Sequence, residues 1–174
     1  MVGYVGLGSN VGAREEHLLA GLLAMHRAGL AVTAVSSLWE TEPVGGAGPG
    51  WFLNMAARIG TERSPEEVLR VLLAVERARG RIRSRPNAPR ELDLDLLLLG
   101  DERRATPELT LPHPRIWSRR FVLAPLAEIA PALVNPATGR TVARELEALD
   151  DPHIVRRAGA LALPETIPVY SRAL

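Results

Sequence analysis

The stretch Arg90-Glu91-Leu92-Asp93-Leu94-Asp95-Leu96-Leu97-Leu98 alternates acidic and apolar residues and then becomes wholly apolar. Successive side chains of a β-strand point to opposite faces, so Asp93 and Asp95 share one face and the intervening leucines share the other. The two carboxylates leave the backbone about 6.6 Å apart, two strand rises. We therefore expect a central strand over residues 92–99 that carries a carboxylate pair on one face and core leucines on the other.

The rest of the chain supplies the partners of that strand. Hydrophobic spacing and turn residues predict further strands over residues 2–7, 30–39, 52–61 and, briefly, 109–111. Helices are expected around residues 18–25, 64–80, 121–129 and 141–149, the second opened by the capping sequence Ser64-Pro65-Glu66-Glu67. The leading order is strand, helix, strand, strand, helix, strand. It predicts an α+β fold, with a ferredoxin-like antiparallel sheet and helices packed on its faces.

Composition limits the possible functions. The chain has 174 residues, 47% of them hydrophobic, which suits one compact domain. We place that domain at residues 1–150 and treat residues 151–174, which contain several prolines, as an extended C-terminal tail of unknown role. The absence of cysteine excludes disulfides, thiolate metal sites and a cysteine nucleophile.

Net charge, the length of the apolar runs and the first residues of the chain indicate which partners and which location to expect. A net charge of +1 gives no case for binding nucleic acid or a membrane surface. No apolar run approaches the roughly 20 residues of a membrane helix. The first residues read as a strand and lack the features of a signal peptide, so we expect a cytoplasmic protein.

The carboxylate pair predicts a metal site. Two like charges on an apolar strand need compensation, and Mg²⁺ binds a few carboxylates together with phosphate oxygens. The alternative is a solvated outer face on which Asp93 and Asp95 pair with arginines.

Arginines cluster just before this strand. Residues 77–90 contain six arginines and no acidic residue, and Pro86-Asn87-Ala88-Pro89 marks their second half as a loop. Guanidinium groups bind phosphate oxygens in a bidentate manner, so a basic loop next to Asp93 and Asp95 suits a polyphosphate–metal site. The alternative is an exposed basic edge.

Two smaller motifs could complete a site. His113 lies between Pro112 and Pro114 on a stiff backbone and could donate to a phosphate oxygen, although a lone histidine is often structural. On the 52–61 strand, Phe52 and Asn54 share a face, where a ring and an amide could hold a flat heterocycle. Alternatively, Phe52 is an ordinary core residue.

Several of these blocks, in order, resemble the 6-hydroxymethyl-7,8-dihydropterin pyrophosphokinase family. The most specific is the run from Ala88 to Leu97. Supporting blocks are Tyr4–Asn10, Ser36–Pro43, Phe52–Asn54, Leu111–Arg115 and Arg119–Leu126. The resemblance covers most of the chain up to about Leu149.

The resemblance implies transfer of pyrophosphate from ATP to the hydroxymethyl group of 6-hydroxymethyl-7,8-dihydropterin, with release of AMP. Two Mg²⁺ ions would be held by Asp93 and Asp95. The other implied contacts are Arg81, Arg90, His113 and Arg119 to phosphates, Glu76 and Thr110 on the ATP side, and Thr41, Val44, Phe52, Asn54 and Phe121 around the pterin. We expect a monomer, with the tail as a possible oligomer contact.

One segment departs from the family pattern. Pro86-Asn87-Ala88 stand where the family usually has Arg-Trp-Gly, so the tryptophan that caps the pterin in many relatives is absent. Trp51 and Trp117 are the candidates to replace it. Two rival functions remain: an RNA-binding module on a ferredoxin-like sheet, and a different Mg²⁺-dependent phosphoryl or nucleotidyl transferase.

Overall fold

The computed structural model describes residues 1–43, 50–80 and 89–167. The elements, in chain order, are β1 (Val2–Ser9), α1 (Arg14–Arg27), β2 (Ala31–Val35), β3 (Leu38–Thr41), β4 (Phe52–Gly60), α2 (Pro65–Ala78), β5 (Asp93–Leu99), β6 (Arg104–Ala105), β7 (Thr110–Leu111), a 3₁₀ turn (Ile116–Ser118), α3 (Arg120–Ile129), α4 (Val142–Ala148) and β8 (Val155–Gly159).

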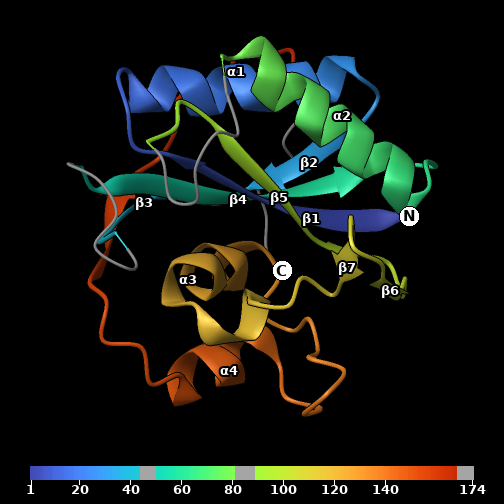
Figure 1. The fold of residues 1–174 in the computed structure, drawn as a ribbon. Coiled ribbons are helices and arrows are strands. Elements are labelled where there is room, and N and C mark those ends of the chain that lie inside the picture. Colours follow the sequence, from blue (N-terminus) through green and yellow to red (C-terminus); the bar gives the residue numbers. More distant parts are fainter. Residues whose placement is uncertain (44–49, 81–88, 168–174) are drawn as a thin grey trace.

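The main sheet is antiparallel throughout. Its strand order is β5-β1-β4-β3-β8, and β2 also pairs with β4. Helices α1 and α2 cover one face, and α3, backed by α4, covers the other (Figure 1). This arrangement confirms the predicted α+β fold with a ferredoxin-like sheet and helices on its faces.

The second helix begins as its sequence predicts. The Ser64 hydroxyl accepts a hydrogen bond from the Glu67 backbone N–H at 3.3 Å, and the Glu67 carboxylate accepts one from the Ser64 N–H at 2.9 Å. This reciprocal cap satisfies two N–H groups that have no partner within the helix. The buried positions Val68, Leu72 and Val75 then face the sheet.

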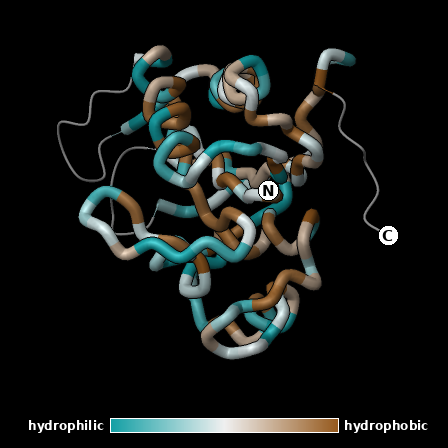
Figure 2. Tube along the Cα trace, turned by 90° about the vertical axis from the view of Figure 1, so that its right-hand side faces the viewer, coloured by the Kyte–Doolittle hydropathy of each residue, from teal (hydrophilic) through white to brown (hydrophobic). Residues whose placement is uncertain are grey.

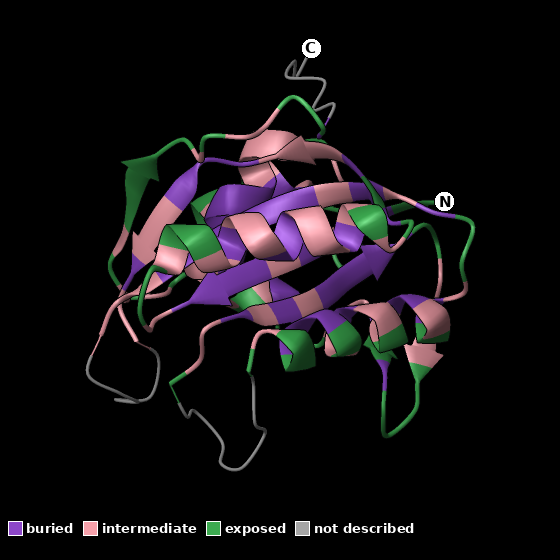
Figure 3. Ribbon diagram, turned by 90° about the horizontal axis from the view of Figure 1, so that it is seen from above, coloured by how far each residue is buried: buried purple, intermediate pink, exposed green. Residues whose placement is uncertain are grey.

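The sheet separates two hydrophobic clusters. The larger one packs α1 and α2 against leucines and branched residues of the strands, including Leu94 and Leu96. The smaller one joins Leu97 and Leu98 to α3 and α4. Seen from above, α1 and α2 expose only their outer faces over strands that are largely buried (Figure 3). The apolar parts of the trace run through the centre of the molecule (Figure 2).

The predicted strand over residues 30–39 is in fact two strands, β2 and β3. Ser36 and Ser37 interrupt it, and both are buried. The Ser36 hydroxyl donates to the Ser37 carbonyl at 2.7 Å and accepts from the Ala56 N–H at 2.9 Å. These hydrogen bonds replace ladder bonds at the break, so both strands still pair with β4.

The sequence predicted that the strand with the carboxylates is central in the sheet, and this prediction is wrong. Strand β5 ends the strand order and pairs with β1 alone among the strands of this sheet that the structure describes. Its outer edge is covered: the Leu94 N–H donates to Glu76 Oε1 at 2.8 Å, and the Leu97 carbonyl accepts from the His113 N–H at 2.9 Å. The unbroken run of leucines at residues 96–99 reflects this cover as well as the two packed faces.

The chain beyond Asp150 contributes to the sheet. Residues 155–159 form β8, which pairs antiparallel with β3, with Val155 opposite Thr41. No strand was predicted there. Within the described ranges, no helix combines the length and the apolar character needed to cross a membrane.

Candidate active site

A cavity of about 240 Å³ lies between the sheet and α3, on the face opposite α1 and α2. Its walls come from β1, β3, β4 and β5 on one side and from α3 and the segment that leads into it on the other. The lining residues that carry polar or aromatic groups are Thr41, Glu42, Phe52, Asn54, Arg90, Asp93, Asp95, Arg115, Arg119 and Phe121. Gly6, Gly8, Leu97, Val122 and Pro125 are among the others.

Two glycines of β1 open the floor of this cavity. Gly6 lies opposite Asp95 and Gly8 opposite Asp93 in the strand register. A Cβ atom on Gly8 would lie only 2.6 Å from Asn54 Oδ1, which no side chain tolerates without displacing that amide. Gly8 therefore keeps space between the amide of Asn54 on β4 and the carboxylate of Asp93 on β5.

The carboxylates lie on this face, as their alternation predicted. Arg90 Nη1 is 2.5 Å from Asp93 Oδ2, and both side chains are about one-fifth exposed (18% and 20%). Asn10 holds the Arg90 backbone: its Oδ1 accepts from the Arg90 N–H at 2.8 Å. Asp93 therefore pairs with an arginine, as one of the two predicted alternatives has it, but inside the cavity and not on a solvated outer face.

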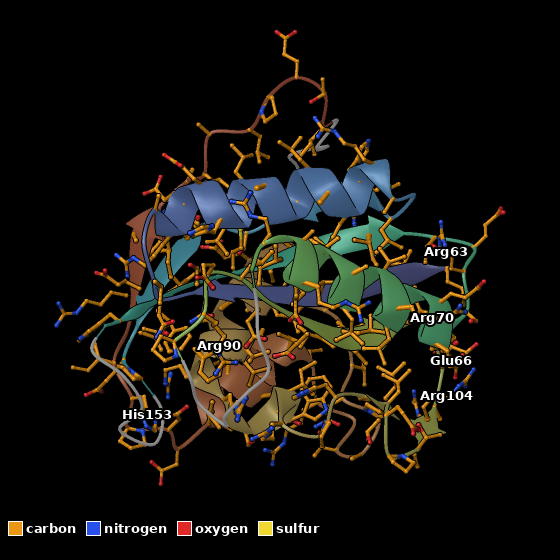
Figure 4. The ribbon with its side chains drawn as sticks, turned by 45° about the horizontal axis from the view of Figure 1, so that its top comes forward. Arg63, Glu66, Arg70, Arg90, Arg104 and His153 are labelled. Carbon is orange, nitrogen blue, oxygen red and sulfur yellow. The ribbon has the colours of Figure 1, made fainter. Side chains whose placement is uncertain are left out.

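The Arg90 guanidinium also lies 5.7 Å from the centre of the Phe52 ring. The Arg90–Asp93 ion pair lies in the cavity, whereas the more exposed ion pair of Arg104 with Glu66 lies at the far end of the molecule (Figure 4). Arg90 therefore links the carboxylates to the aromatic wall of the cavity.

The opposite wall has a second cation and a second ring. Phe121 is the second residue of α3, and the Arg119 guanidinium lies 5.3 Å from its ring centre. Burial lowers the pKa of Arg119 and the nearby Arg115 adds to this, while Asp95 and Asp93 oppose it. An anion entering beside Arg119 and Arg115 would relieve the repulsion between the two cations.

An amide and a hydroxyl lie beside the Phe52 ring. Asn54 Nδ2 donates to Thr41 Oγ1 at 2.7 Å, and both side chains are buried. This bond orients the Asn54 amide toward the cavity floor, where it can present polar atoms to a planar ligand.

His113 does not line the cavity; its backbone N–H donates to the Leu97 carbonyl on the outer edge of β5. Burial lowers its pKa to about 4, helped by Arg119 and Arg115 and opposed by Asp93. The imidazole is therefore neutral at neutral pH. Its Nδ1 accepts from the Arg115 N–H at 3.2 Å, so Nε2 carries the hydrogen and is the atom that can donate.

Most of the predicted site residues meet in this one cavity. Those that line it are Asp93, Asp95, Arg90, Arg119, Thr41, Phe52, Asn54 and Phe121. Val44 and Arg81 lie outside the described residues. Thr110 is exposed on β7, and Glu76 is buried on α2 beneath β5, so neither lines the cavity.

Neither candidate tryptophan lines the cavity. Trp51 lies under the guanidinium of Arg156, at 5.4 Å, beside a separate hollow. Trp117 packs against the smaller hydrophobic cluster. The glycine floor, Arg115 and Glu42 line the cavity without having been predicted. All four residues, Gly6, Gly8, Glu42 and Arg115, fall within the sequence blocks that carry the family resemblance, and that is the signal that could have found them.

The donor set fits a hard divalent cation. Asp93 and Asp95 line one face of β5, and carboxylate oxygens are the ligands that Mg²⁺ prefers. Among the described residues, no group of three or more histidine, cysteine, aspartate or glutamate side chains could hold a metal ion without other ligands. Two carboxylates plus phosphate oxygens match the way Mg²⁺ is usually bound with nucleotides.

Together, the fold and the cavity define a small α+β protein with a carboxylate pair, arginines and two aromatic rings around one cavity. Comparison with known proteins gives the family. The family model for 7,8-dihydro-6-hydroxymethylpterin-pyrophosphokinase matches residues 4–131. The 2-amino-4-hydroxy-6-hydroxymethyldihydropteridine pyrophosphokinase of Bacillus subtilis is 43% identical over 145 residues, which cover 83% of this chain and 87% of the relative. Its counterpart from Methylorubrum extorquens is 43% identical over 155 residues, or 88% and 96% of the two chains. The chain belongs to the 7,8-dihydro-6-hydroxymethylpterin-pyrophosphokinase family.

Solved structures agree on the fold. The wild-type HPPK-DHPS of Plasmodium falciparum in complex with SDX-DHP aligns with a TM-score of 0.64 at 12% identity, over 84% of this chain and 44% of that one. An HPPK-DHPS crystallised with its substrates gives a TM-score of 0.63 at 12% identity, over 84% and 43%. The chain thus spans less than half the length of these two-part proteins, and the likeness concerns the fold alone.

Proposed function

We propose that this chain carries out the pyrophosphokinase reaction of folate biosynthesis with the cavity described above as its acceptor site. Pyrophosphate passes from ATP to the hydroxymethyl oxygen of 6-hydroxymethyl-7,8-dihydropterin, and AMP leaves. The convergence of two aromatic rings, a buried amide and a carboxylate pair in one cavity carries the proposal.

The pterin end of the cavity is built for a flat, polar heterocycle. Phe52 and Phe121 line opposite walls and would stack on the two faces of the ring system. Asn54, held by Thr41, would hydrogen-bond to its edge. Val44 is assigned to the same pocket by the family resemblance.

The phosphate end is dominated by arginines. Arg90, Arg115 and Arg119 line it. His113 lies outside the cavity lining and is assigned to the phosphates by the family resemblance, and its Nε2 is the atom that would donate to a phosphate oxygen. Arg81, Thr110 and Glu76 are assigned to the ATP side by resemblance. Transfer of this kind depends on positioning and charge neutralisation more than on covalent catalysis, and these side chains provide both.

Asp93 and Asp95 are the residues that would hold magnesium, two ions by the family resemblance. Bound Mg²⁺ supplies Lewis-acid stabilisation of the charge that develops on the transferred phosphates. The carboxylates themselves fix the position of that charge relative to Phe52 and Phe121. Arg90 keeps Asp93 in place through their ion pair.

The first test is product analysis. Purified protein is incubated with ATP, Mg²⁺ and 6-hydroxymethyl-7,8-dihydropterin, and the nucleotides are resolved. We expect AMP to form in step with the pterin pyrophosphate. Release of ADP would instead mark transfer of a single phosphate. No turnover, together with salt-dependent RNA binding in the absence of Mg²⁺, would favour the RNA-binding alternative.

The remaining partner and location assignments belong to the same proposal. ATP and the pterin are the expected small-molecule partners, with neither nucleic acid nor membrane involved. We propose a cytoplasmic monomer whose pyrophosphokinase residues lie within 1–150, with β8 of the C-terminal segment completing the sheet. Size-exclusion chromatography with light scattering tests the oligomeric state, since a dimer would double the expected 18.8 kDa.

A further inference from the structure

The chain after α4 returns to the cavity and caps the helix that forms one of its walls. The carboxylate of Asp151 is only 8% exposed, and its Oδ2 accepts a hydrogen bond from the Arg120 backbone N–H at 2.8 Å. That amide lies between Arg119 and Phe121, the two residues of this wall that carry the cation and the ring.

Helix α3 has no cap of its own. Its N-cap residue is Arg119, whose side chain makes no capping hydrogen bond. The first N–H groups of a helix need acceptors from elsewhere, and a carboxylate is favoured there by the helix dipole. Asp151 supplies that acceptor from a point about thirty residues further along the chain.

The contact is reciprocal and well enclosed. The Arg120 guanidinium donates to the carbonyl oxygens of Leu149 at 2.7 Å and Asp151 at 3.3 Å. Asp151 Oδ1 accepts from the His153 N–H at 3.0 Å. Burial by itself would raise the pKa of Asp151, but hydrogen bonds from the Arg120 and His153 N–H groups lower it overall, so the cap is charged at neutral pH.

The same segment also holds the opposite wall. The Ile154 carbonyl accepts from the Glu42 N–H at 3.0 Å, and the Ile154 N–H donates to the Glu42 carboxylate at 3.2 Å. Glu42 and its neighbour Thr41 both line the cavity. Residues 151–155 thus bridge the α3 wall and the β3 wall.

A third contact secures the far end of α3. Arg157 Nε lies 3.1 Å from Glu128 Oε1 and donates to the Ser37 hydroxyl at 2.9 Å. The tail therefore fastens α3 near both its ends. In Figure 1 it runs from α4 along one side of the molecule to β8, and the label of His153 in Figure 4 marks its course.

We propose that Asp151 is a positioning residue for the acceptor substrate: by capping α3 it sets the place of Phe121 and Arg119 relative to Phe52 and Asn54. The inference rests on the proposed function, because it assumes that the pterin binds between Phe52 and Phe121. It assigns to the C-terminal tail a role in acceptor binding.

The test compares Asp151→Ala and Asp151→Asn with Glu147→Gln, which removes an exposed carboxylate paired with Arg144 on α4. Steady-state kinetics give KM for each substrate. For Asp151→Ala we expect KM for the pterin to rise about tenfold, the size of a lost helix cap, with KM for ATP changed less than about twofold. Asp151→Asn keeps an oxygen for the Arg120 N–H, so it should rescue most of the loss. Glu147→Gln should match the wild type.

Amide hydrogen exchange supplies a second readout that does not depend on turnover. The Arg120 amide should exchange faster in Asp151→Ala and normally in Glu147→Gln. Faster exchange with an unchanged KM for the pterin would overturn the inference, because the cap would then serve stability only. An equal rise in KM for both substrates would also overturn it. If Asp151→Ala fails to fold, Asp151→Asn decides. A wild-type KM for the pterin together with a protected Arg120 amide supports the inference. A wild-type KM with an unprotected Arg120 amide overturns it.

The two proposals fail in different ways. A wild-type protein that binds no pterin rejects the proposed function, and this inference with it. A wild type that binds and converts pterin normally, beside an Asp151→Ala variant with unchanged pterin KM, rejects this inference alone.

Discussion

The two faces of the sheet use the same strands for opposite purposes. Toward α1 and α2, β5 presents Leu94 and Leu96, which are 3% and 4% exposed and belong to the larger hydrophobic cluster. Toward α3, the alternate positions of β5 present Asp93 and Asp95 beside the glycines of β1. One face is filled and the other is left hollow, because side chains alternate with a period of two.

This difference separates stability from chemistry along a single strand. A change on the leucine face removes buried apolar contacts, while a change on the carboxylate face leaves those contacts in place. Neighbouring substitutions in β5 should therefore have effects of different kinds.

The largest effect is expected from Asp95→Ala. Losing one of the two carboxylates assigned to the metal should lower kcat by about three orders of magnitude, because electrostatic stabilisation of the transferred phosphates is the main catalytic contribution. Thermal unfolding should change little. Asp101→Ala, which alters an exposed acidic residue just beyond the same strand, is the control and should keep wild-type turnover. Near-normal activity of Asp95→Ala would refute the assignment.

Leu96→Ala, the adjacent position on the other face, should do the reverse. A large-to-small change at a buried leucine lowers the free energy of unfolding by about 2–5 kcal/mol. Urea unfolding followed by circular dichroism measures this loss. Well below the unfolding transition, kcat should stay within about threefold of the wild type. A selective loss of kcat without loss of stability would show that the two faces are not separable.

Gly8→Ala tests the hollow itself. The new Cβ would meet Asn54 Oδ1 at 2.6 Å, so the amide must move and its bond to Thr41 must weaken. We expect pterin affinity to fall about tenfold, as for the loss of one well-placed polar contact, with a smaller change in ATP affinity. Gly6→Ala is the matched change, since its Cβ would find its nearest atom at an ordinary 3.6 Å. Equal losses from both variants would mean that cavity volume, and not Asn54, is what matters.

The smallest effect concerns pH and the neutral His113. Its pKa is lowered from 6.5 to about 4 in the folded protein, so between these values the unfolded chain binds a proton that the folded chain does not. The contribution of His113 to stability is therefore complete above pH 6.5 and is lost as the pH falls toward about 4. Denaturation at a series of pH values should show this slope. His113→Gln should flatten it, and an unchanged slope would argue against a neutral, buried imidazole.

The fold was predictable wherever the hydrophobic pattern was strong. The capping box predicted where α2 begins, and the alternation in β5 predicted that Asp93 and Asp95 share one face of the strand. Both depend on neighbouring residues alone, and the structure confirms both. Strand β8 escaped prediction because its residues, Val155–Gly159, are mostly exposed at an edge and carry no apolar alternation. The position of β5 at the end of the sheet was missed for a related reason: an edge covered by Glu76 and by the His113 segment is as apolar as a central strand.

The site was predictable as chemistry but only partly as geometry. Residue types and spacing pointed to Asp93, Asp95 and Phe52, and all three line the cavity. The role of Gly8 could not be read from the sequence, because it depends on which β4 residue lies opposite it. The same holds for Asp151, whose partner on α3 is distant in the chain.

The place of β8 in the sheet has a consequence for how the protein is made. During translation this strand emerges from the ribosome after every other strand of its sheet, while its partner β3 emerges early. Until then, β3 presents an open edge, the kind of surface that nascent chains must protect from mispairing. The cavity wall held by Glu42 and Ile154 is likewise completed only at that stage, so a ribosome-bound intermediate would have a folded sheet and an unfinished site.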